Sequence, residues 1–417
     1  MHTFNKILIA VGLFATQSVA AENLNSMAQN SPQGISAPDS LGNTDKTGLR
    51  ISFNGRESVL KFDPFGKDLT DTTSMGFQFS FVPFVGTNGT YSGTAVNDYS
   101  FNLLGGYSAG TNRLELAGLF NINRGNMLGV QLAGLFNQVG GKVDGVQLAG
   151  LFNSNLDSVK AVQLAGLMNF TTGPVDGVQI AGLTNFSPKP VEGVQVAGIM
   201  NFTASELEGT QVAGVLNFAA KNVKGSQVGL LNFANKVDGF QLGLINYADS
   251  MSGVPVGLIS WVRTGYQAVE IGANEILPLN LALRTGKREF YTMPFIGIRP
   301  EIDDQLTWSF GYGVGTSPRL GKKTFLNIEV SSEQLSKGEV EALNLVNRFY
   351  LGGEFQISPK LAIYGGPTFN FRVYDTSFTD HPELFAYSSP KVHNEKYYPE
   401  DLGSQLWWGF KAGFRFF

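Results

Sequence analysis

The nine-residue stretch Gly-Val-Gln-Leu-Ala-Gly-Leu-Phe-Asn, from Gly145 to Asn153, recurs with small changes along the middle of the chain. Its glutamine position advances in six steps of 16 residues and one step of 14, through Gln131, Gln147, Gln163, Gln179, Gln195, Gln211, Gln227 and Gln241. Glu115 fills this position in an earlier copy and Pro255 in a last one, which makes ten copies. Such a fixed period predicts a repeat architecture for the whole region.

Each copy alternates apolar and polar residues. The asparagine position keeps pace with the glutamine position, at Asn121, Asn137, Asn153, Asn169, Asn185, Asn201, Asn217, Asn232, Asn246 and Ser260. Because alternate side chains of a strand point to opposite faces, each copy predicts a β-strand with Val, Leu and Phe on one face and Gln and Asn on the other. Charged residues fall between the copies, and none lies inside copies two to nine.

Composition limits the class of protein. Only 15% of the 417 residues are charged, whereas ordinary globular proteins are about a quarter charged. Membrane β-barrels alternate apolar and polar residues and therefore lack long apolar runs. The net charge of −4 gives no reason to expect nucleic-acid binding. The chain contains no cysteine, which excludes disulfides, thiolate metal sites and a lipoprotein anchor.

The N-terminal residues have the pattern of a secretory signal peptide, residues 1–20. Lys6 supplies a positive charge, residues 7–14 form a short apolar core, and Ser18-Val-Ala20 is a small-residue cleavage site. Residues 21–48 are rich in Asn, Ser, Gly, Pro and Asp without any period. They are predicted to be a disordered exported linker.

Alternating strands are expected over residues 49–417, with the repeats filling 113–262. After the repeats, only Ser358-Pro359 separates two strands, whereas the connections over 332–346 and 374–404 are long. Short turns at one end and long loops at the other are typical of outer-membrane barrels. Residues 374–404 are therefore predicted to be a long extracellular loop.

Two architectures fit this β repeat. In a barrel each copy is one strand and one turn, and the 11 residues of 143–153 match the 9–11 or so that span a bilayer. In a β-solenoid each copy is one coil, and like residues stack into ladders. The charge-free band favours the barrel, because a lipid-facing charge near the midplane costs about 2–4 kcal/mol.

We therefore predict an all-β fold that forms an antiparallel transmembrane β-barrel of about 18–20 strands, with a β-solenoid as the alternative. The pairing of successive glutamine positions distinguishes the two. Antiparallel pairing indicates a barrel, and parallel pairing indicates a solenoid.

The copies at Gln227 and Gln241 lack the alanine of the other copies. Removing one residue within a strand turns every later side chain to the opposite face. Either the Ala-Gly pair of the longer copies forms a β-bulge, or the last copies are arranged differently.

Candidate binding residues are of two kinds. The repeated amides either satisfy one another across neighbouring strands or form an uncharged lumen lining, with Gln131, Gln147, Gln163, Gln179, Gln195, Gln211, Gln227, Asn137, Asn153, Asn169, Asn185, Asn201 and Asn217 as its members. The predicted loop also carries aromatic residues of the kind that bind partners, namely Phe385, Tyr387, Tyr397 and Tyr398.

Two further patterns raise the question of catalysis or metal binding. Residues 106–110, Gly-Tyr-Ser-Ala-Gly, match a nucleophile elbow around Ser108, but that motif needs a strand-to-helix turn and here lies between strands. Asp380, His381 and Glu383 lack a full set of metal ligands. No catalytic, cofactor-binding or metal-binding residues are therefore predicted.

The repeats resemble those of a group of bacterial surface-repeat proteins. The likeness includes residues 100–107, Ser-Phe-Asn-Leu-Leu-Gly-Gly-Tyr, and 241–246, Gln-Leu-Gly-Leu-Ile-Asn, and covers roughly residues 76–300. It implies an exported surface or outer-membrane protein and brings no activity or catalytic residues. The aromatic C-terminus is similar to that of outer-membrane barrels, although Phe417 shares its face with Lys411 and Arg415.

The sequence thus predicts an outer-membrane β-barrel, structural or passively channel-forming like a porin, without catalysis. Its expected partners are the lipid of the outer membrane and a surface or host-cell ligand bound by the loops. The alternative function is that of a surface-exposed β-solenoid used for adhesion.

Overall fold

The computed structural model describes residues 49–53, 56–60, 71–301, 306–385 and 388–417. The expected signal peptide, 1–20, and linker, 21–48, lie outside these residues. The chain divides into two compact units, residues 1–63 and 64–417. In the first unit, β1 (Leu49–Phe53) and β2 (Arg56–Leu60) form an antiparallel hairpin.

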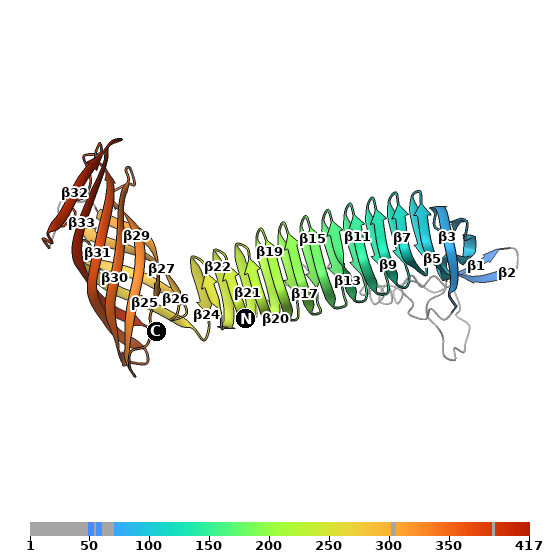
Figure 1. Cartoon of the computed structure of the whole chain (residues 1–417), viewed down its shortest axis with the longest axis horizontal. Coiled ribbons are helices and arrows are strands. Elements are labelled where there is room, and N and C mark those ends of the chain that lie inside the picture. The colour runs from blue at the N-terminus through green and yellow to red at the C-terminus, as the bar shows by residue number, and fades with distance from the viewer. Residues whose placement is uncertain (1–48, 54–55, 61–70, 302–305, 386–387) are drawn as a thin grey trace, which may run out of the picture. The chain divides into compact units, whose positions relative to one another are not determined.

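The repeats form a β-solenoid of stacked parallel coils (Figure 1). In successive coils β11 (Val143–Ala149) pairs in parallel with β13 (Val159–Ala165), and Gln147 lies opposite Gln163. Parallel pairing was the expected mark of the alternative architecture. The prediction that the repeats are strands of a large antiparallel barrel is therefore wrong, and the solenoid alternative is confirmed.

Each coil consists of a long strand, a corner, a short strand and a second corner. The other long strands are β7 (Gly110–Ala117), β9 (Met127–Ala133), β15 (Val175–Ala181), β17 (Val191–Ala197) and β19 (Leu207–Ala213). The short strands are β8 (Phe120–Asn123), β10 (Phe136–Val139), β12 (Phe152–Asn155), β14 (Met168–Thr171), β16 (Thr184–Ser187) and β18 (Met200–Thr203).

The ends of the solenoid are less regular. It begins with β3 (Thr73–Val82), β4 (Val85–Gly86), the 3-10 helix η2 (Gly89–Thr94), β5 (Ala95–Asn102) and β6 (Gly105–Ser108). It finishes with β20 (Leu216–Val228), β21 (Leu231–Leu242), β22 (Ile245–Met251), β23 (Val254–Val256) and β24 (Ile259–Val262). In β20 and β21 the chain stays extended from the short strand of one coil into the long strand of the next.

The corner between the two strands of a coil explains how the shorter copies keep their register. In a 16-residue copy the alanine is the last residue of the long strand, as at Ala149, and the corner follows at Gly150. In the Gln227 copy the strand ends at Val228, one residue earlier. Gln227 and Asn232 are nevertheless both fully buried. The missing residue is the last one of the long strand, and the corner keeps two residues, Gly229 and Leu230. Because the corner separates the two strands, the side chains of the next strand are not turned over.

Residues 266–416 form an antiparallel barrel that closes through pairing of its first strand with its last. Its eight strands are β25 (Tyr266–Asn274), β26 (Leu279–Gly286), β27 (Tyr291–Pro300), β28 (Leu306–Thr316), β29 (Thr324–Lys337), β30 (Asn344–Ser358), β31 (Leu361–Asp375) and β33 (Leu402–Phe416). The short strand β32 (Val392–Tyr398) pairs with β33. An antiparallel barrel thus exists, but with eight strands in place of about 18–20.

The outer wall of the barrel is apolar. In β30 the alternate residues Phe349 and Leu351 are each 43% exposed, whereas Arg348 and Tyr350 between and beside them are buried. β33 follows the same rule, with Phe414 and Phe416 outside and Arg415 inside. Within the described part of the chain, no helix is both long and apolar enough to cross a membrane.

The last coil and the barrel belong to the same compact unit and share hydrogen bonds. The Tyr312 hydroxyl donates to the carbonyl of Gly257 at 2.7 Å, and the amide of Ser260 donates to Thr285 Oγ1 at 3.0 Å. Tyr312 lies on β28 in phase with Phe310, on the outer side of the barrel wall.

One glycine position makes the coil geometry testable. Gly177 has φ = 144°, and a Cβ atom added there would lie 2.2 Å from the carbonyl oxygen of Ala161 in the preceding coil. We expect Gly177→Ala to destabilise the protein by about 1–3 kcal/mol, because both backbone conformation and space demand glycine. Thermal unfolding followed by far-UV circular dichroism measures the effect.

Gly76→Ala is the matched control, because a Cβ at Gly76 has nothing within 4 Å. It should leave the unfolding midpoint nearly unchanged. Equal midpoints for the two variants would contradict the coil geometry.

Candidate functional site

The glutamines form one continuous hydrogen-bonded ladder inside the coils. Gln147 Nε2 donates to Gln131 Oε1 at 2.8 Å, and Gln163 Nε2 donates to Gln147 Oε1 at 2.6 Å. The same pattern begins at Gln241 and ends where Gln131 Nε2 donates to Glu115 Oε2 at 2.9 Å. Every amide in this ladder therefore donates toward the N-terminus.

The asparagines form a second ladder that runs the other way. Asn137 Nδ2 donates to Asn153 Oδ1 at 3.0 Å, and the series ends where Asn246 Nδ2 donates to Ser260 Oγ at 3.2 Å. Each asparagine also donates to a backbone carbonyl of the next coil, as Asn153 does to Leu164 at 2.9 Å. The dipoles of the two ladders oppose each other.

The ladders show where the predicted lumen residues lie. All thirteen are fully buried inside the coils: Gln131, Gln147, Gln163, Gln179, Gln195, Gln211, Gln227, Asn137, Asn153, Asn169, Asn185, Asn201 and Asn217. They line the interior of a solenoid, whereas the sequence had suggested a barrel lumen. Their partners are one another and the backbone, which is the structural role weighed from the sequence.

Glu115 ends the glutamine ladder with a buried carboxylate. Its oxygens accept hydrogen bonds from Gln131, from Thr111 at 3.2 Å and from Asn102 at 3.4 Å. Burial raises the pKa of Glu115, and the hydrogen bonds from these neutral donors only partly oppose that rise.

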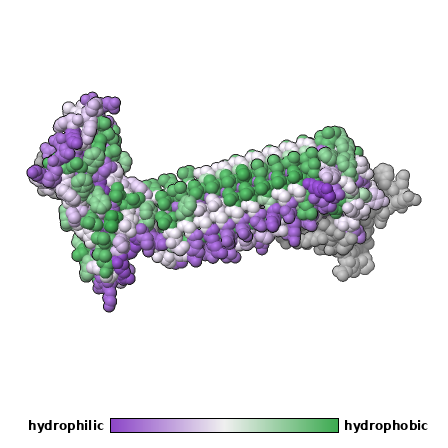
Figure 2. Space-filling view, in the orientation of Figure 1, coloured by the Kyte–Doolittle hydropathy of each residue, from purple (hydrophilic) through white to green (hydrophobic). Residues whose placement is uncertain are grey.

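The coil reverses its polarity from one corner to the other. Near the corner that precedes the long strand, Val143 and Val159 are buried in an apolar core while Asp144 and Lys160 are exposed. We call this side the charged edge. Figure 2 shows it as a hydrophilic band along the coils.

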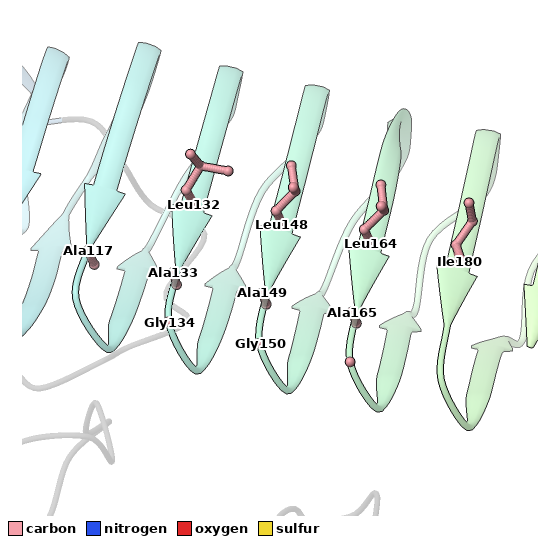
Figure 3. A pocket seen from close by; sticks show the side chains of 11 residues that line it. Ala117, Leu132, Ala133, Gly134, Leu148, Ala149, Gly150, Leu164, Ala165 and Ile180 are labelled. Carbon is pink, nitrogen blue, oxygen red and sulfur yellow. The ribbon is translucent and has the colours of Figure 1, made fainter. Parts of the chain in front are cut away.

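At the opposite corner the amides are inside and the apolar residues are outside. We call this row the apolar edge: Leu119, Leu135, Leu151, Leu167, Leu183, Ile199, Val215, Leu230, Leu244 and Leu258, which are between 38% and 52% exposed. Leu132, Leu148, Leu164 and Ile180 stand in a parallel row beside it and line an open groove with the small Ala and Gly residues of the corners (Figure 3). Figure 2 shows a continuous hydrophobic stripe along the coils.

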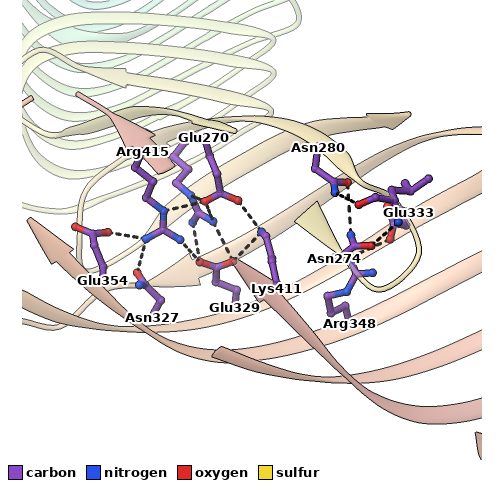
Figure 4. Close-up of polar contacts among 12 residues, drawn as sticks. Glu270, Asn274, Asn280, Asn327, Glu329, Glu333, Arg348, Glu354, Lys411 and Arg415 are labelled. Carbon is purple, nitrogen blue, oxygen red and sulfur yellow. Dashed lines mark hydrogen bonds and ion pairs between the residues drawn. The ribbon is translucent and has the colours of Figure 1, made fainter. Parts of the chain in front are cut away.

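The barrel interior contains a buried ionic cluster that was not predicted from the sequence (Figure 4). Arg415 bonds to Glu270 at 2.8 Å, Glu329 at 3.2 Å and Glu354 at 2.6 Å. Arg284 and Lys411 pair with Glu270 at 2.6 Å and 2.7 Å. Arg288 also pairs with Glu354 at 3.0 Å, so three carboxylates face four cations. The signal in the sequence was isolated charges on one face of the alternating strands, as at Glu329 and Glu333 of β29 and at Lys411 and Arg415 of β33.

An apolar cluster of the barrel includes the turn between β25 and β26. Ile276 and Leu277, in the turn between β25 and β26, are buried with Trp407. Phe385 packs edge-on against Trp407, with ring centroids 5.4 Å apart. Arg299 holds the same segment through the carbonyl of Glu383 at 2.6 Å.

The aromatic residues predicted to bind partners therefore do not form one site. Phe385 packs against the barrel cluster, whereas Tyr397 and Tyr398 on β32 are 69% and 50% exposed. Tyr387 lies outside the described residues.

The residues considered for chemistry also lie apart. Ser108 is buried in β6, and its hydroxyl donates to the carbonyl of Gly110 at 3.3 Å. His381 contacts the rings of Tyr374 and Phe378, and burial lowers its pKa. In the described ranges, no group of three or more His, Cys, Asp or Glu side chains could hold a metal ion.

In comparisons with known proteins, no family model, no curated protein and no solved structure matches the chain.

The Glu115→Gln variant tests the electrostatics of the ladder. Folding raises the pKa of the Glu115 carboxyl above its value in the unfolded chain. The stability linked to this carboxyl is therefore fully present below its pKa in the unfolded chain, and it is lost as the pH rises through its pKa in the folded protein. At neutral pH the variant should be more stable than the wild type by about 1–3 kcal/mol. Toward acidic pH the difference should vanish, as thermal unfolding across a pH series would show.

Glu208→Gln is the control, since Glu208 is exposed on the charged edge beside Lys224. It should shift stability by less than about 0.5 kcal/mol. A Glu115→Gln variant that is less stable at neutral pH, or a difference that does not change with pH, would contradict the prediction.

Proposed function

We propose that the chain is a membrane-anchored structural protein, in which the barrel of residues 266–416 is an outer-membrane anchor and residues 73–262 are the β-solenoid that it holds at the membrane. The observation that carries the proposal is the polarity of the barrel. Its wall is apolar on the outside, and its ionic cluster is buried on the inside. A protein that folds in water has the opposite arrangement.

The wall suits a bilayer in detail. Membrane barrels need closed backbone pairing, which β25 and β33 complete here. They also need an apolar outer band. The signal-peptide pattern expected at residues 1–20 supports export.

The interior favours an anchor over a channel. Arg284, Arg415 and Glu354 have fully buried side chains at the level of the cluster. Barrels of eight strands have an interior that side chains just fill. We therefore expect purified protein to need detergent, to migrate differently before and after heating, and to give no stepwise conductance in planar bilayers. Full solubility in buffer without detergent would contradict the anchor, and stable conductance steps would favour the channel.

Lysine substitutions at two depths of the wall test the anchor. Leu351 lies near the middle of β30 and Ile357 near its end, and they are 43% and 47% exposed. In phospholipid vesicles, Leu351→Lys should cost about 2–4 kcal/mol and Ile357→Lys about 0–1 kcal/mol. Urea unfolding followed by tryptophan fluorescence measures both.

The two variants are matched in chemistry and exposure and differ in depth. If the wall faced water or another protein, the loss of stability would not be expected to depend on depth. Equal losses at the two positions would speak against lipid contact.

A further inference from the structure

We infer that the apolar edge of the solenoid lies along a lipid bilayer surface, with its row of leucines among the acyl chains. The inference rests on the proposed function for the presence of a membrane, but it gives the solenoid a lipid contact separate from that of the barrel.

The first argument is the reversal of polarity within each coil. At the charged edge the coil is built for water, with valines such as Val143 and Val159 inside and charges outside. At the apolar edge Gln and Asn are inside, and residues such as Leu167 and Leu183, each 43% exposed, are outside. One coil is therefore suited to two solvents on its two sides.

The second argument is the extent and uniformity of the stripe. Coils in a parallel β-stack are about 4.8 Å apart, so ten coils extend the apolar edge over roughly 43 Å. Soluble monomers rarely expose a continuous apolar surface of such extent. All charges of copies two to nine lie outside this stripe.

The third argument is that the backbone at the apolar edge does not depend on water. The amide of Leu151 donates to the carbonyl of Leu135 at 2.7 Å, and that of Leu167 donates to Leu151 at 2.8 Å. The asparagine ladder satisfies carbonyls of the adjacent long strand from inside, as Asn137 does for Leu148 at 2.8 Å. Backbone groups at a lipid contact need such internal partners, because hydrocarbon offers none.

The fourth argument is continuity with the wall of the barrel. Leu258 is the last residue of the apolar edge and is 41% exposed. Its neighbour Gly257 accepts the hydrogen bond from Tyr312, which lies in phase with Phe310 on the outer face of β28. The stripe therefore meets the surface that is proposed to face lipid.

A lipid surface fits this edge better than a second copy of the chain does. Successive coils present nearly identical residues, so two such edges could slide by one coil without losing contacts. A specific protein interface needs polar groups that fix its register, and the leucine row offers none. Acyl chains require only a continuous apolar surface.

Single cysteines in the full-length, naturally cysteine-free chain provide the test. Leu167→Cys reports on the apolar edge, Glu192→Cys on the charged edge and Phe349→Cys on the barrel wall. Each variant is labelled with bimane and reconstituted into phosphatidylethanolamine–phosphatidylglycerol vesicles, with or without nitroxide-labelled phospholipid. Far-UV circular dichroism and heat-modifiable migration verify that each labelled protein is folded.

We expect nitroxide lipid to quench the probes at residues 167 and 349 at least twofold more strongly than the probe at 192. Quenching at 349 with no more quenching at 167 than at 192 overturns the inference and leaves the barrel anchor standing. Absence of quenching at all three positions overturns both proposals. A disulfide-linked dimer formed efficiently by unlabelled Leu167→Cys, together with weak quenching at 167, identifies a second copy as the occupant and also overturns the inference.

Discussion

The solenoid depends on one constraint: each buried side-chain amide must find its partners in the coil before and the coil after. A buried polar group left without a partner costs about 1–3 kcal/mol, and the ladders carry two such groups in almost every coil. Identical residues at identical places solve the problem, as Gln147 and Gln163 do. The constant 16-residue step follows from this matching. The later, shorter copies are tolerated because residues are lost beside the corners and outside the ladders, so Gln227 and Asn232 remain buried.

The two ladders also differ in direction, and their ends are chemically suited to it. The glutamine amides donate toward the N-terminus, where Glu115 offers carboxylate oxygens as acceptors. The asparagine amides donate toward the C-terminus, where the Ser260 hydroxyl accepts. The dipoles of the two amide ladders therefore point in opposite directions along the stack.

The solenoid and the barrel reach a similar surface through different topologies. The barrel closes antiparallel strands around Arg415 and its carboxylates and turns Phe349 and Leu351 outward. The solenoid stacks parallel coils around the amide ladders and turns residues such as Leu167 outward at one edge. In both, buried polar side chains bond to one another beneath an apolar exterior. At the charged edge alone the coil returns to the arrangement that water favours.

The sequence by itself determined the extended conformation of the repeats, their period, their two faces and the charge-free band, because these follow from local alternation. It did not show the corner that divides residues 143–153, expected to be one strand, into β11 and β12. Only the tertiary structure decided which strands pair and in which direction, because alternation fixes the sides of a strand and not its neighbour. The same Gln and Asn rows would fit a barrel lumen or a coil interior. The corner at Gly150 could equally have been a bulge, since glycine suits both. Likewise, the sequence places Phe385 in a loop, and only the folded structure shows its contact with Trp407.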